Sequence, residues 1–332
     1  MARAARGRDD RLVLVTGGAG YKGSTLCREL LFRGYRVRVL DSLMYGGRSL
    51  SAFFNHAGFE FVRGDVTDPR CVDSAMAGVT DVIHLAAIVG DKPCERDPKR
   101  SVEVNYKGTQ IMAEAARRHK IGHFLFASTC SNYGIVDPSI PAKEDGELNP
   151  VSLYAETKID CERYLTDAAK HGGFSPVMLR FSTGFGISGR TRFDLTINSF
   201  TYEAMRDNRI IVYAEEGWRP FLHVLDIARI YCRMLELPTA RLAGEIFNAG
   251  WDEQNYTKRQ IVQFILDVLG EFEVDRINTI EDKRSYRVDF GKIRKVLGIA
   301  PLKTVRDGVS EISAAIRTGI LTEQDFENNR LK

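Results

Sequence analysis

The sequence predicts an α/β fold, with a doubly wound parallel sheet over the first half of the chain and a smaller mixed α/β lobe after it. Up to Phe181, short apolar runs rich in branched residues alternate with amphipathic stretches of helical period. Strands that alternate with helices in this way form a parallel sheet covered on both faces. After Phe181 the candidate elements become shorter and less regular, which indicates a second, smaller lobe.

The individual elements follow from the same patterns, because a buried parallel strand is a short apolar run and a surface helix repeats its apolar residues every three or four positions. The expected strands are Leu12–Thr16, Arg36–Leu40, Phe59–Arg63, Asp81–Leu85, His123–Ser128, Pro176–Phe181, Arg209–Tyr213 and Glu245–Asn248. The first expected helix ends near Arg33. The other expected helices are Pro69–Ala77, Lys99–Arg118, Leu153–Ala169, Val224–Leu237 and Lys258–Leu269. These elements place one domain at residues 11–181 and a lobe at 182–325, with about 210–250 returning to the first domain.

Composition narrows the class of protein. The 332 residues exceed one ordinary domain, and 44% hydrophobic with 27% charged residues excludes a disordered or fibrous chain. A net charge of +3 is too small for a nucleic-acid or membrane-surface partner. No apolar run approaches the ~20 residues of a membrane span, and the first residues lack the apolar core of a secretory signal. Six scattered cysteines without a CxxC pair predict reduced thiols in a cytoplasmic protein, with no metal site.

A glycine-rich segment joins the first strand to the first helix. Gly17, Gly20 and Gly23 have the spacing at which the backbone turns tightly, approaches a pyrophosphate and lets helix and strand pack closely. The phosphates would face the N–H groups and the positive dipole end of the helix. Because glycine-rich turns are common, these three residues alone leave an ordinary turn open.

Asp41 makes the cofactor interpretation stronger. It ends the second expected strand, about 20 residues beyond the loop, where a carboxylate accepts hydrogen bonds from the adenosine ribose and repels a 2′-phosphate. The pattern therefore favours NAD over NADP, against the alternative of a turn aspartate. Asp65 follows the third strand and is a candidate for the adenine amino group. The remaining candidate cofactor contacts are Tyr21, Lys22, Val66, Leu85, Ala86, Ala87, Ser128 and Phe181.

Tyr154 and Lys158 stand four residues apart on an expected helix, and so on one helical face. An ammonium beside a phenol lowers the pKa of the phenol, which could then take a proton from a sugar hydroxyl while hydride leaves the same carbon. Thr129 follows the fifth strand, at the sheet edge where such folds bind ligands, and could hydrogen-bond the reacting oxygen. We therefore interpret Thr129, Tyr154 and Lys158 as the catalytic residues.

In this order, the motifs resemble the extended short-chain dehydrogenase/reductase family, in particular its NAD-dependent nucleotide-sugar epimerases and dehydratases. The resemblance runs to about Leu302 and is more specific for the family than for the reaction. It implies a Rossmann NAD domain, a lobe that holds a nucleoside diphosphate sugar, and a homodimer built on two long helices per subunit. The motifs are Thr16 to Gly23, His84 to Ala87, Val104 to Thr109, Ser128 to Gly134, Tyr154 to Lys158, Leu179 to Phe181 and Arg219 to Val224.

The resemblance also implies roles for single residues. Thr129 would hydrogen-bond the C4 oxygen of the sugar and Tyr154 would be the base, while Lys158 would hold the nicotinamide ribose. Arg219 resembles the diphosphate-binding arginine of the family, against the alternative of an exposed surface arginine, and Arg284 is a second candidate for the same charge. Arg192 and Asn198 are further substrate candidates, as is Arg190, although all three suit a solvated loop equally well.

Four positions depart from the family pattern. Members that dehydrate carry Asp-Glu directly after the Ser or Thr, and members that decarboxylate a uronic acid carry Glu at the second position, whereas this chain has Cys130 and Ser131. Neither is an evident proton donor and base for the neighbouring carbons, so both reactions lose support. Cys130 is either an acid/base with a lowered pKa or a compact buried residue. Lys22 replaces an apolar residue and would bring charge near the phosphates, and Thr183, a substrate candidate, replaces a common Asn.

We therefore predict an NAD-dependent epimerase of a nucleoside diphosphate sugar, acting at C4 through a transient 4-keto sugar with Tyr154 as base. The alternative is a C4 dehydrogenase or 4-ketoreductase of the same substrates, whose first step uses the same residues. A third hypothesis is a sensor or scaffold that keeps the fold without turnover, and the intact Tyr154 and Lys158 weigh against it.

Overall fold

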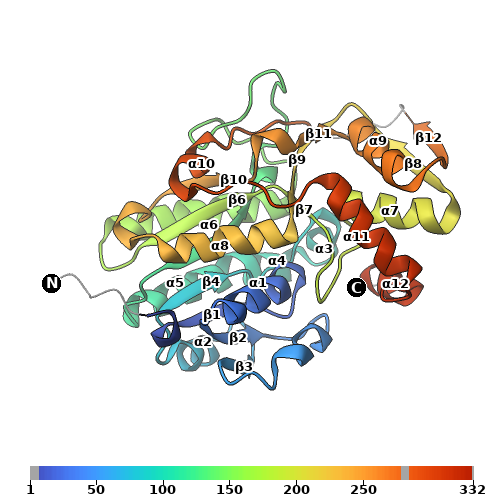
Figure 1. The fold of residues 1–332 in the computed structure, drawn as a ribbon. Coiled ribbons are helices and arrows are strands. Elements are labelled where there is room, and N and C mark those ends of the chain that lie inside the picture. The colour runs from blue at the N-terminus through green and yellow to red at the C-terminus, as the bar shows by residue number, and fades with distance from the viewer. Residues whose placement is uncertain (1–6, 278–283, 331–332) are drawn as a thin grey trace. The chain divides into compact units, whose positions relative to one another are not determined.

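The computed structural model describes residues 7–277 and 284–330, with side chains described up to Phe326 (Figure 1). The chain divides into two compact units, each formed by three segments. Unit 1 contains the chain up to Ser128, Ser152–Leu179 and Ala228–Ile246. Unit 2 contains Thr129–Val151, Arg180–Ile227 and the chain from Phe247 onward.

A seven-stranded sheet in the order β10-β6-β5-β4-β1-β2-β3 confirms the predicted doubly wound architecture. In the registered pairs, β1 runs parallel to both β2 and β4, β2 to β3, and β4 to β5. Parallel pairing directs the carboxyl ends of these strands to one edge of the sheet. The strands are β1 (Leu12–Thr16), β2 (Arg36–Asp41), β3 (Phe59–Arg63), β4 (Asp81–His84), β5 (Phe124–Thr129), β6 (Pro176–Phe181) and β10 (Ile246–Ala249).

Helices flank this sheet, with α1 and α8 in front of it and α5 and α6 behind it in the view of Figure 1. Their starts follow from local sequence: Asp68 caps α2 and Asp97 caps α4, each just before a proline, and Ser152 caps α6. The helices are α1 (Tyr21–Phe32), α2 (Pro69–Met76), α3 (Asp91–Arg96), α4 (Pro98–Val102), α5 (Gly108–Arg118), α6 (Leu153–Lys170) and α8 (Val224–Glu236).

The single helix expected at Lys99–Arg118 is in fact three segments. A π-helical stretch, η3 (Glu103–Lys107), separates α4 from α5. The interruption coincides with Asn105, whose carboxamide accepts from the Ile88 N–H at 2.8 Å and donates to the Ile88 carbonyl at 3.0 Å. Tertiary hydrogen bonds from this one buried residue fix the local winding, which helical periodicity alone does not reveal.

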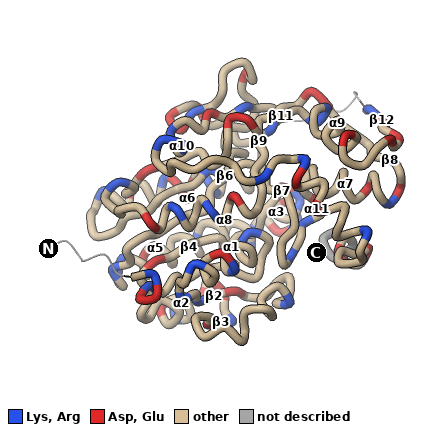
Figure 2. Tube along the Cα trace, in the orientation of Figure 1, with Lys and Arg blue, Asp and Glu red and all other residues tan. Residues whose placement is uncertain are grey.

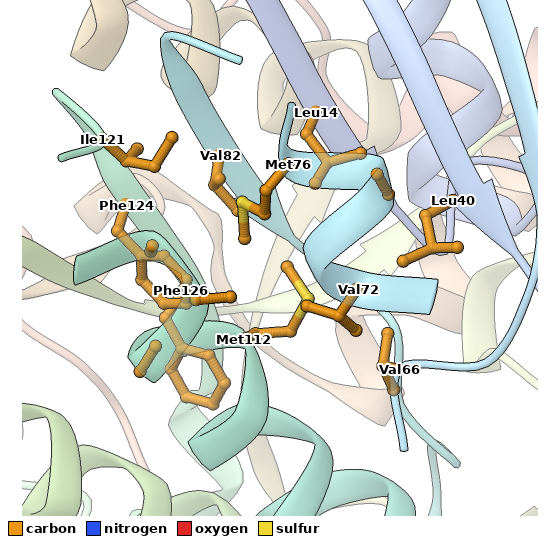
Figure 3. Close-up of a cluster of buried hydrophobic side chains, with 14 of the residues drawn as sticks. Leu14, Leu40, Val66, Val72, Met76, Val82, Met112, Ile121, Phe124 and Phe126 are labelled. Atoms are coloured by element: carbon orange, nitrogen blue, oxygen red, sulfur yellow. The ribbon is translucent and has the colours of Figure 1, made fainter. Parts of the chain in front are cut away.

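One apolar core cluster of unit 1 lies between the sheet and the helices α2 and α5 (Figure 3). Side chains of β1, β4 and β5 meet those of α2 and α5 there, and each labelled residue is buried. Burial of this apolar surface is the main stabilising contribution to the unit. The labelled residues are Leu14, Leu40, Val66, Val72, Met76, Val82, Met112, Ile121, Phe124 and Phe126.

Unit 2 contains two small sheets, β11-β9-β7 and β12-β8, and a second apolar core. In the first sheet β9 pairs with β7 in parallel and with β11 antiparallel, so the predicted mixed character of the lobe is present. The strands are β7 (Thr183–Phe185), β8 (Arg209–Tyr213), β9 (Trp218–His223), β11 (Asn255–Thr257) and β12 (Glu273–Ile277). The helices are α7 (Thr196–Asp207), α9 (Lys258–Leu269), α10 (Gly291–Leu297), α11 (Val305–Arg317) and α12 (Glu323–Arg330).

Charge and hydropathy show no extreme feature. Lys and Arg alternate with Asp and Glu along much of the tube in Figure 2. Within residues 7–277 and 284–330, no helix combines the length and the apolar character needed to cross a membrane.

A buried ion pair ties the start of β4 to β1 in unit 1. Asp81 accepts from Arg11 Nε at 2.9 Å, and its other carboxylate oxygen lies 2.7 Å from His123 Nδ1. Burial raises the pKa of Asp81, but hydrogen bonds from His123 and Arg11 outweigh it and hold that pKa well below the usual range. The carboxylate therefore contributes stability that is complete above the unfolded-state pKa of about 3.9 and is lost as the pH falls through the folded-state value.

Asp81→Asn is expected to lower the free energy of unfolding at pH 7 by about 3 kcal/mol, because it leaves the partly buried Arg11 without its carboxylate partner. The loss should shrink below about pH 5, where the unfolded carboxyl becomes protonated. Urea unfolding at pH 7 and pH 4 measures both effects. Asp73→Asn is the matched control, since Asp73 pairs with Arg118 at the exposed surface. An equal loss in the two variants would contradict the role of the Asp81 pair.

Candidate active site

The glycine loop lies at the carboxyl end of β1, directly before α1. Gly17 adopts a φ of +70°, which favours glycine, and its N–H donates to the Leu40 carbonyl at 2.9 Å. A Cβ at Gly23 would lie 2.3 Å from the Gly17 carbonyl oxygen, and a Cβ at Gly20 would lie 3.1 Å from the same atom. The loop and the first turn of α1 thus pack closely enough that Gly23 must lack a side chain, as the sequence predicted for the third glycine.

Asp41 ends β2 beside this loop. Its Oδ2 accepts from the Ala19 N–H at 2.9 Å and its Oδ1 from the Leu43 N–H at 2.8 Å. A carboxylate oxygen can accept more than one hydrogen bond, so these main-chain bonds are compatible with the expected contact to ribose hydroxyls. The carboxylate is held by the backbone of the glycine loop itself, which places the expected ribose site and the expected phosphate site next to each other.

Asp65, the candidate for the adenine contact, is already engaged by protein groups. Its Oδ1 accepts from the Thr67 N–H at 2.9 Å and hydroxyl at 2.8 Å, and its Oδ2 pairs with the Arg100 guanidinium. Burial raises the pKa of Asp65, but these bonds from Thr67 and Arg100 lower it by more. Arg100, from α4, is a residue that the sequence analysis did not identify. Val66, by contrast, packs in the apolar core of unit 1.

The end of β4 lies against the glycine loop, which suits the small residues expected there. A Cβ at Gly17 would lie 2.8 Å from the Ala86 nitrogen. The Leu85 N–H donates to the Thr16 carbonyl at 3.2 Å, and the Ala86 N–H donates to the Thr16 hydroxyl at the same distance. Main chain of Leu85 and Ala86 therefore forms one wall of the loop, followed by the half-buried Ala87.

A buried chain of hydrogen bonds supports the wall formed by Leu85 and Ala86. His84 Nδ1 lies 2.7 Å from the Thr16 hydroxyl, and His84 Nε2 lies 3.1 Å from the Thr109 hydroxyl. The Thr109 hydroxyl donates its hydrogen bond to the Asn105 carbonyl at 2.6 Å, so it must accept the hydrogen bond from His84. The proton of the neutral ring therefore sits on Nε2, and Nδ1 accepts from Thr16. The Asn105 carboxamide also contacts the Thr157 hydroxyl at 3.4 Å, which links this chain to α6.

Tyr154 and Lys158 lie on one face of α6, as predicted. Lys158 is only 2% exposed, and its Nζ lies 4.6 Å from the ring centre of Phe126 on β5 and 5.9 Å from that of Tyr154. Burial lowers the pKa of the Lys158 ammonium. Burial and the Lys158 charge lower the pKa of His84 to about 3, so the imidazole stays neutral and adds no repulsion. The ammonium thus lies at the carboxyl ends of β4 and β5.

Thr129, Cys130 and Ser131 follow at the end of β5 and belong to unit 2. Thr129 is buried, and its hydroxyl accepts from the Ser131 N–H at 3.1 Å, which starts the short helix η4 (Cys130–Tyr133). Cys130 is 1% exposed, and its thiol donates to the Arg180 carbonyl at 3.0 Å. A carbonyl acceptor holds the proton on sulfur, so this geometry favours the interpretation of Cys130 as a compact buried residue.

The structure makes Arg219 a buried residue, so the alternative of an exposed surface arginine is wrong. The side chain is 7% exposed, donates to the Trp218 carbonyl at 2.7 Å and to the Arg284 carbonyl, and stacks 5.1 Å over the Tyr286 ring. Its pairing with Arg284 is thus through the main chain of that residue. A role of either arginine toward a diphosphate stays a prediction.

The other substrate candidates have well-defined local partners. Asn198 is fully buried; it accepts from the Gly186 N–H at 2.9 Å and donates to the Arg192 carbonyl at 2.8 Å. Arg192 forms a two-point ion pair with Asp194, and Thr183 is half-buried in β7. Asn198 and Arg192 are thereby brought together, and Asn198 orders the segment before α7.

The remaining cofactor candidates occupy the expected elements. Tyr21 is buried and Lys22 half-buried at the start of α1, Phe181 is buried at the end of β6, and Ser128 is buried in β5 with its hydroxyl donating to Glu162. A direct contact of each with a cofactor stays a prediction.

Comparison with known proteins decides the family. The model of the NAD dependent epimerase/dehydratase family matches residues 13–250. The chain belongs to this family. The predicted resemblance is thereby confirmed, and with it NAD as the cofactor on which the family depends. The loop fits that group, since Gly17 and Gly23 leave the backbone bare beside a helix start and Asp41 points its carboxylate to the same place.

Relatives within the family differ in the reaction they catalyse. The chain is 32% identical to the dTDP-glucose 4,6-dehydratase of Actinoplanes sp., over 92% of this chain and 97% of that one. It is 29% identical to the UDP-glucose 4-epimerase of Rhizobium leguminosarum bv. trifolii, over 87% and 92%. The solved UDP-glucuronic acid 4-epimerase of Bacillus cereus, in complex with UDP-glucuronic acid and NAD, is 25% identical, with a TM-score of 0.83 over 92% of this chain and 99% of that one. Membership therefore establishes an NAD-dependent enzyme of the epimerase/dehydratase group and leaves the reaction open.

Gly23→Ala is expected to weaken NAD binding at least 10-fold, about 1.4 kcal/mol, because the added methyl would displace the Gly17 carbonyl that shapes the loop. Isothermal titration with NAD measures the change. Gly7→Ala is the control, since the φ of Gly7 is −57° and its nearest contact to an added Cβ is an ordinary 3.5 Å. Unchanged affinity in the Gly23 variant would contradict the assignment of this loop to the cofactor.

Asp41→Asn is expected to weaken NAD binding about 10-fold while reducing the preference over NADP, because the variant loses a charged acceptor and the repulsion of a 2′-phosphate together. Titrations with both cofactors give the ratio of the two dissociation constants. A variant that keeps the wild-type ratio would show that another group sets the preference.

Proposed function

We propose that this family member is an epimerase of a nucleoside diphosphate sugar that acts at C4 through a transient 4-keto sugar. The observation that carries the proposal is the Tyr154–Lys158 pair on α6, with a buried ammonium 5.9 Å from the centre of the phenol ring. A cation held there stabilises a phenolate, which is the base that oxidation of a sugar hydroxyl requires.

In this proposal Tyr154 takes the proton of the C4 hydroxyl as the C4 hydride leaves, and Thr129 donates a hydrogen bond to the same oxygen. Bound NAD supplies the acceptor and donor of that hydride. The 4-keto sugar then rotates in the site so that hydride returns to its other face. Tyr154 returns the proton to the oxygen. No net oxidation occurs, and the product differs from the substrate only in configuration at C4.

Residues 130 and 131 favour epimerisation over dehydration. Elimination of water needs an acid and a base at the carbons beside the ketone. At the two positions where dehydratases carry Asp-Glu, this chain has Cys130 and Ser131. The Cys130 thiol is buried and donates to the Arg180 carbonyl. Oxidation and reduction at C4 need neither group, which is why the epimerase is preferred although a dehydratase is among the similar proteins.

We also propose a homodimer and a cytoplasmic location. The neighbouring helices α5 and α6 supply the two long helices that the resemblance implies for the dimer. The six cysteines are free thiols, as a reducing compartment would keep them.

The direct test is incubation of the purified protein with UDP-, GDP-, CDP- and dTDP-sugars without added cofactor. Proton NMR of the sugar and nicotinamide absorbance are followed together. A C4 epimer without a lasting absorbance change is the expected result. A keto product with reduced nicotinamide would instead establish the C4 dehydrogenase, and a 6-deoxy-4-keto product would contradict the interpretation of Cys130 and Ser131.

Tyr154→Phe is expected to lower kcat by about 10²–10⁴-fold, the usual contribution of a positioned base, while NAD binding changes little. Tyr164→Phe on the same helix is the matched control, because Tyr164 packs edge-on against Tyr106. Turnover by the sugar assay and NAD affinity by titration are measured for both. Retained turnover in the Tyr154 variant would support a sensor or scaffold instead.

A further inference from the structure

Glu162 is a buried carboxylate that the proposed chemistry does not use. It lies on α6 one turn after Lys158, is 3% exposed, and accepts a hydrogen bond from the Ser128 hydroxyl. Ser128 is itself buried, next to the last residue of β5. Glutamate is rarely buried this deeply unless it is paired or hydrogen-bonded, because removing the charge from water is costly.

The groups that face Lys158 differ in the charge they can offer. They are Tyr154, Cys161 and Glu162 from α6, Cys94 from α3 and His84 from β4. Burial raises the pKa of Cys161 to about 11 and also raises that of Cys94, so both thiols stay protonated near neutral pH. The imidazole of His84 is neutral there as well. Glu162 is the one carboxyl group in this set.

The ammonium needs such a countercharge because the thiols and the imidazole of this set carry no charge near neutral pH. Phe126 covers it with the face of a ring at 4.6 Å, which stabilises a cation but brings no net negative charge. Desolvation favours the uncharged amine, and a carboxylate at the i+4 position, shielded from water, opposes it more strongly than at a helix surface. The Ser128 hydroxyl fixes one oxygen of that carboxylate to the sheet.

We propose that Glu162 is a positioning residue, whose carboxylate, anchored to β5 by Ser128, holds the Lys158 ammonium charged and in place beside Tyr154. The proposal rests on the function proposed for Tyr154 and Lys158 and extends it. Glu162 acts through Lys158 and lies about two helical turns from Tyr154. It thereby sets the upper pH at which the catalytic pair works.

The test is Glu162→Gln, which keeps the shape and removes the charge. The alkaline limb of the kcat profile is expected to move down by about one pH unit, the size of a 1.4 kcal/mol change in interaction, and kcat should fall more than KM changes. Glu162→Asp keeps the charge and should restore the limb. Glu156→Gln, at the exposed face of the same helix, is the matched control and should leave the profile unchanged.

A second measurement does not depend on turnover. The Lys158 Cε signal of carbon-13 lysine-labelled, NAD-bound protein, assigned with Lys158→Gln, is titrated by NMR in wild type and in Glu162→Gln. The expected result is a lower midpoint in the variant. If Glu162→Gln does not fold, Ser128→Ala, which removes the hydrogen bond of Ser128 to the carboxylate, should shift the midpoint in the same direction by less.

The outcomes separate the two proposals. A lower Lys158 midpoint in a protein that converts no sugar of the panel supports the role of Glu162 and overturns the proposed reaction. An active wild type whose Glu162→Gln variant keeps both the alkaline limb and the midpoint overturns the role of Glu162. A loss of stability with both readouts unchanged likewise shows that Glu162 is only structural, and an unshifted Ser128→Ala midpoint overturns the anchor.

Discussion

The buried ammonium of Lys158 is the constraint around which the site in unit 1 is organised. A lysine placed at the end of a sheet, almost without access to water, is stable as a cation only if its neighbours compensate for the lost hydration. Each neighbour accords with that need: Phe126 presents a ring face, His84 is kept neutral, and Glu162 brings a fixed negative charge. The same ammonium lies close enough to Tyr154 for its charge to act on the phenol.

Parallel topology explains why these groups meet the cofactor loop. The strands β1, β2, β4 and β5 end at one edge, so Thr16, Asp41, His84 and Ser128 come together although they are far apart in sequence. The chain Thr16–His84–Thr109–Asn105 joins the loop wall to the π-helical stretch and to α6. Hydrogen-bond geometry assigns the imidazole proton to Nε2, so the chain is satisfied along its length. The loop and α6 are therefore parts of one buried hydrogen-bond network.

Local patterns in the sequence were sufficient for the strands and the cofactor motif. Most expected strands agree with the structure within a residue, because apolar runs bounded by glycine or polar residues are local signals, and the glycine spacing records a steric requirement that Gly23 meets directly. The features that were missed depend on partners distant in the chain. The break in the helix at 103–107 coincides with the hydrogen bonds between Asn105 and Ile88. Asp65 is paired with Arg100, and Arg219 is buried against Tyr286. Glu162 was visible at i+4 from Lys158, but only the folded β5 shows that its side chain points inward to Ser128.

The choice of reaction depends on different residues from the choice of fold. The chain is similar both to a dehydratase and to an epimerase, so membership of the family does not by itself determine the reaction. The fate of a ketone depends on the acid and base groups beside the adjacent carbons, and in the proposed site the short helix that Thr129 starts would supply them. There the Cys130 thiol donates a hydrogen bond to the Arg180 carbonyl inside unit 2, and the Ser131 N–H donates one to the capping Thr129 hydroxyl. Both residues take part in building η4, which is why we propose the reaction that needs no further acid or base: removal of hydride from C4 and its return.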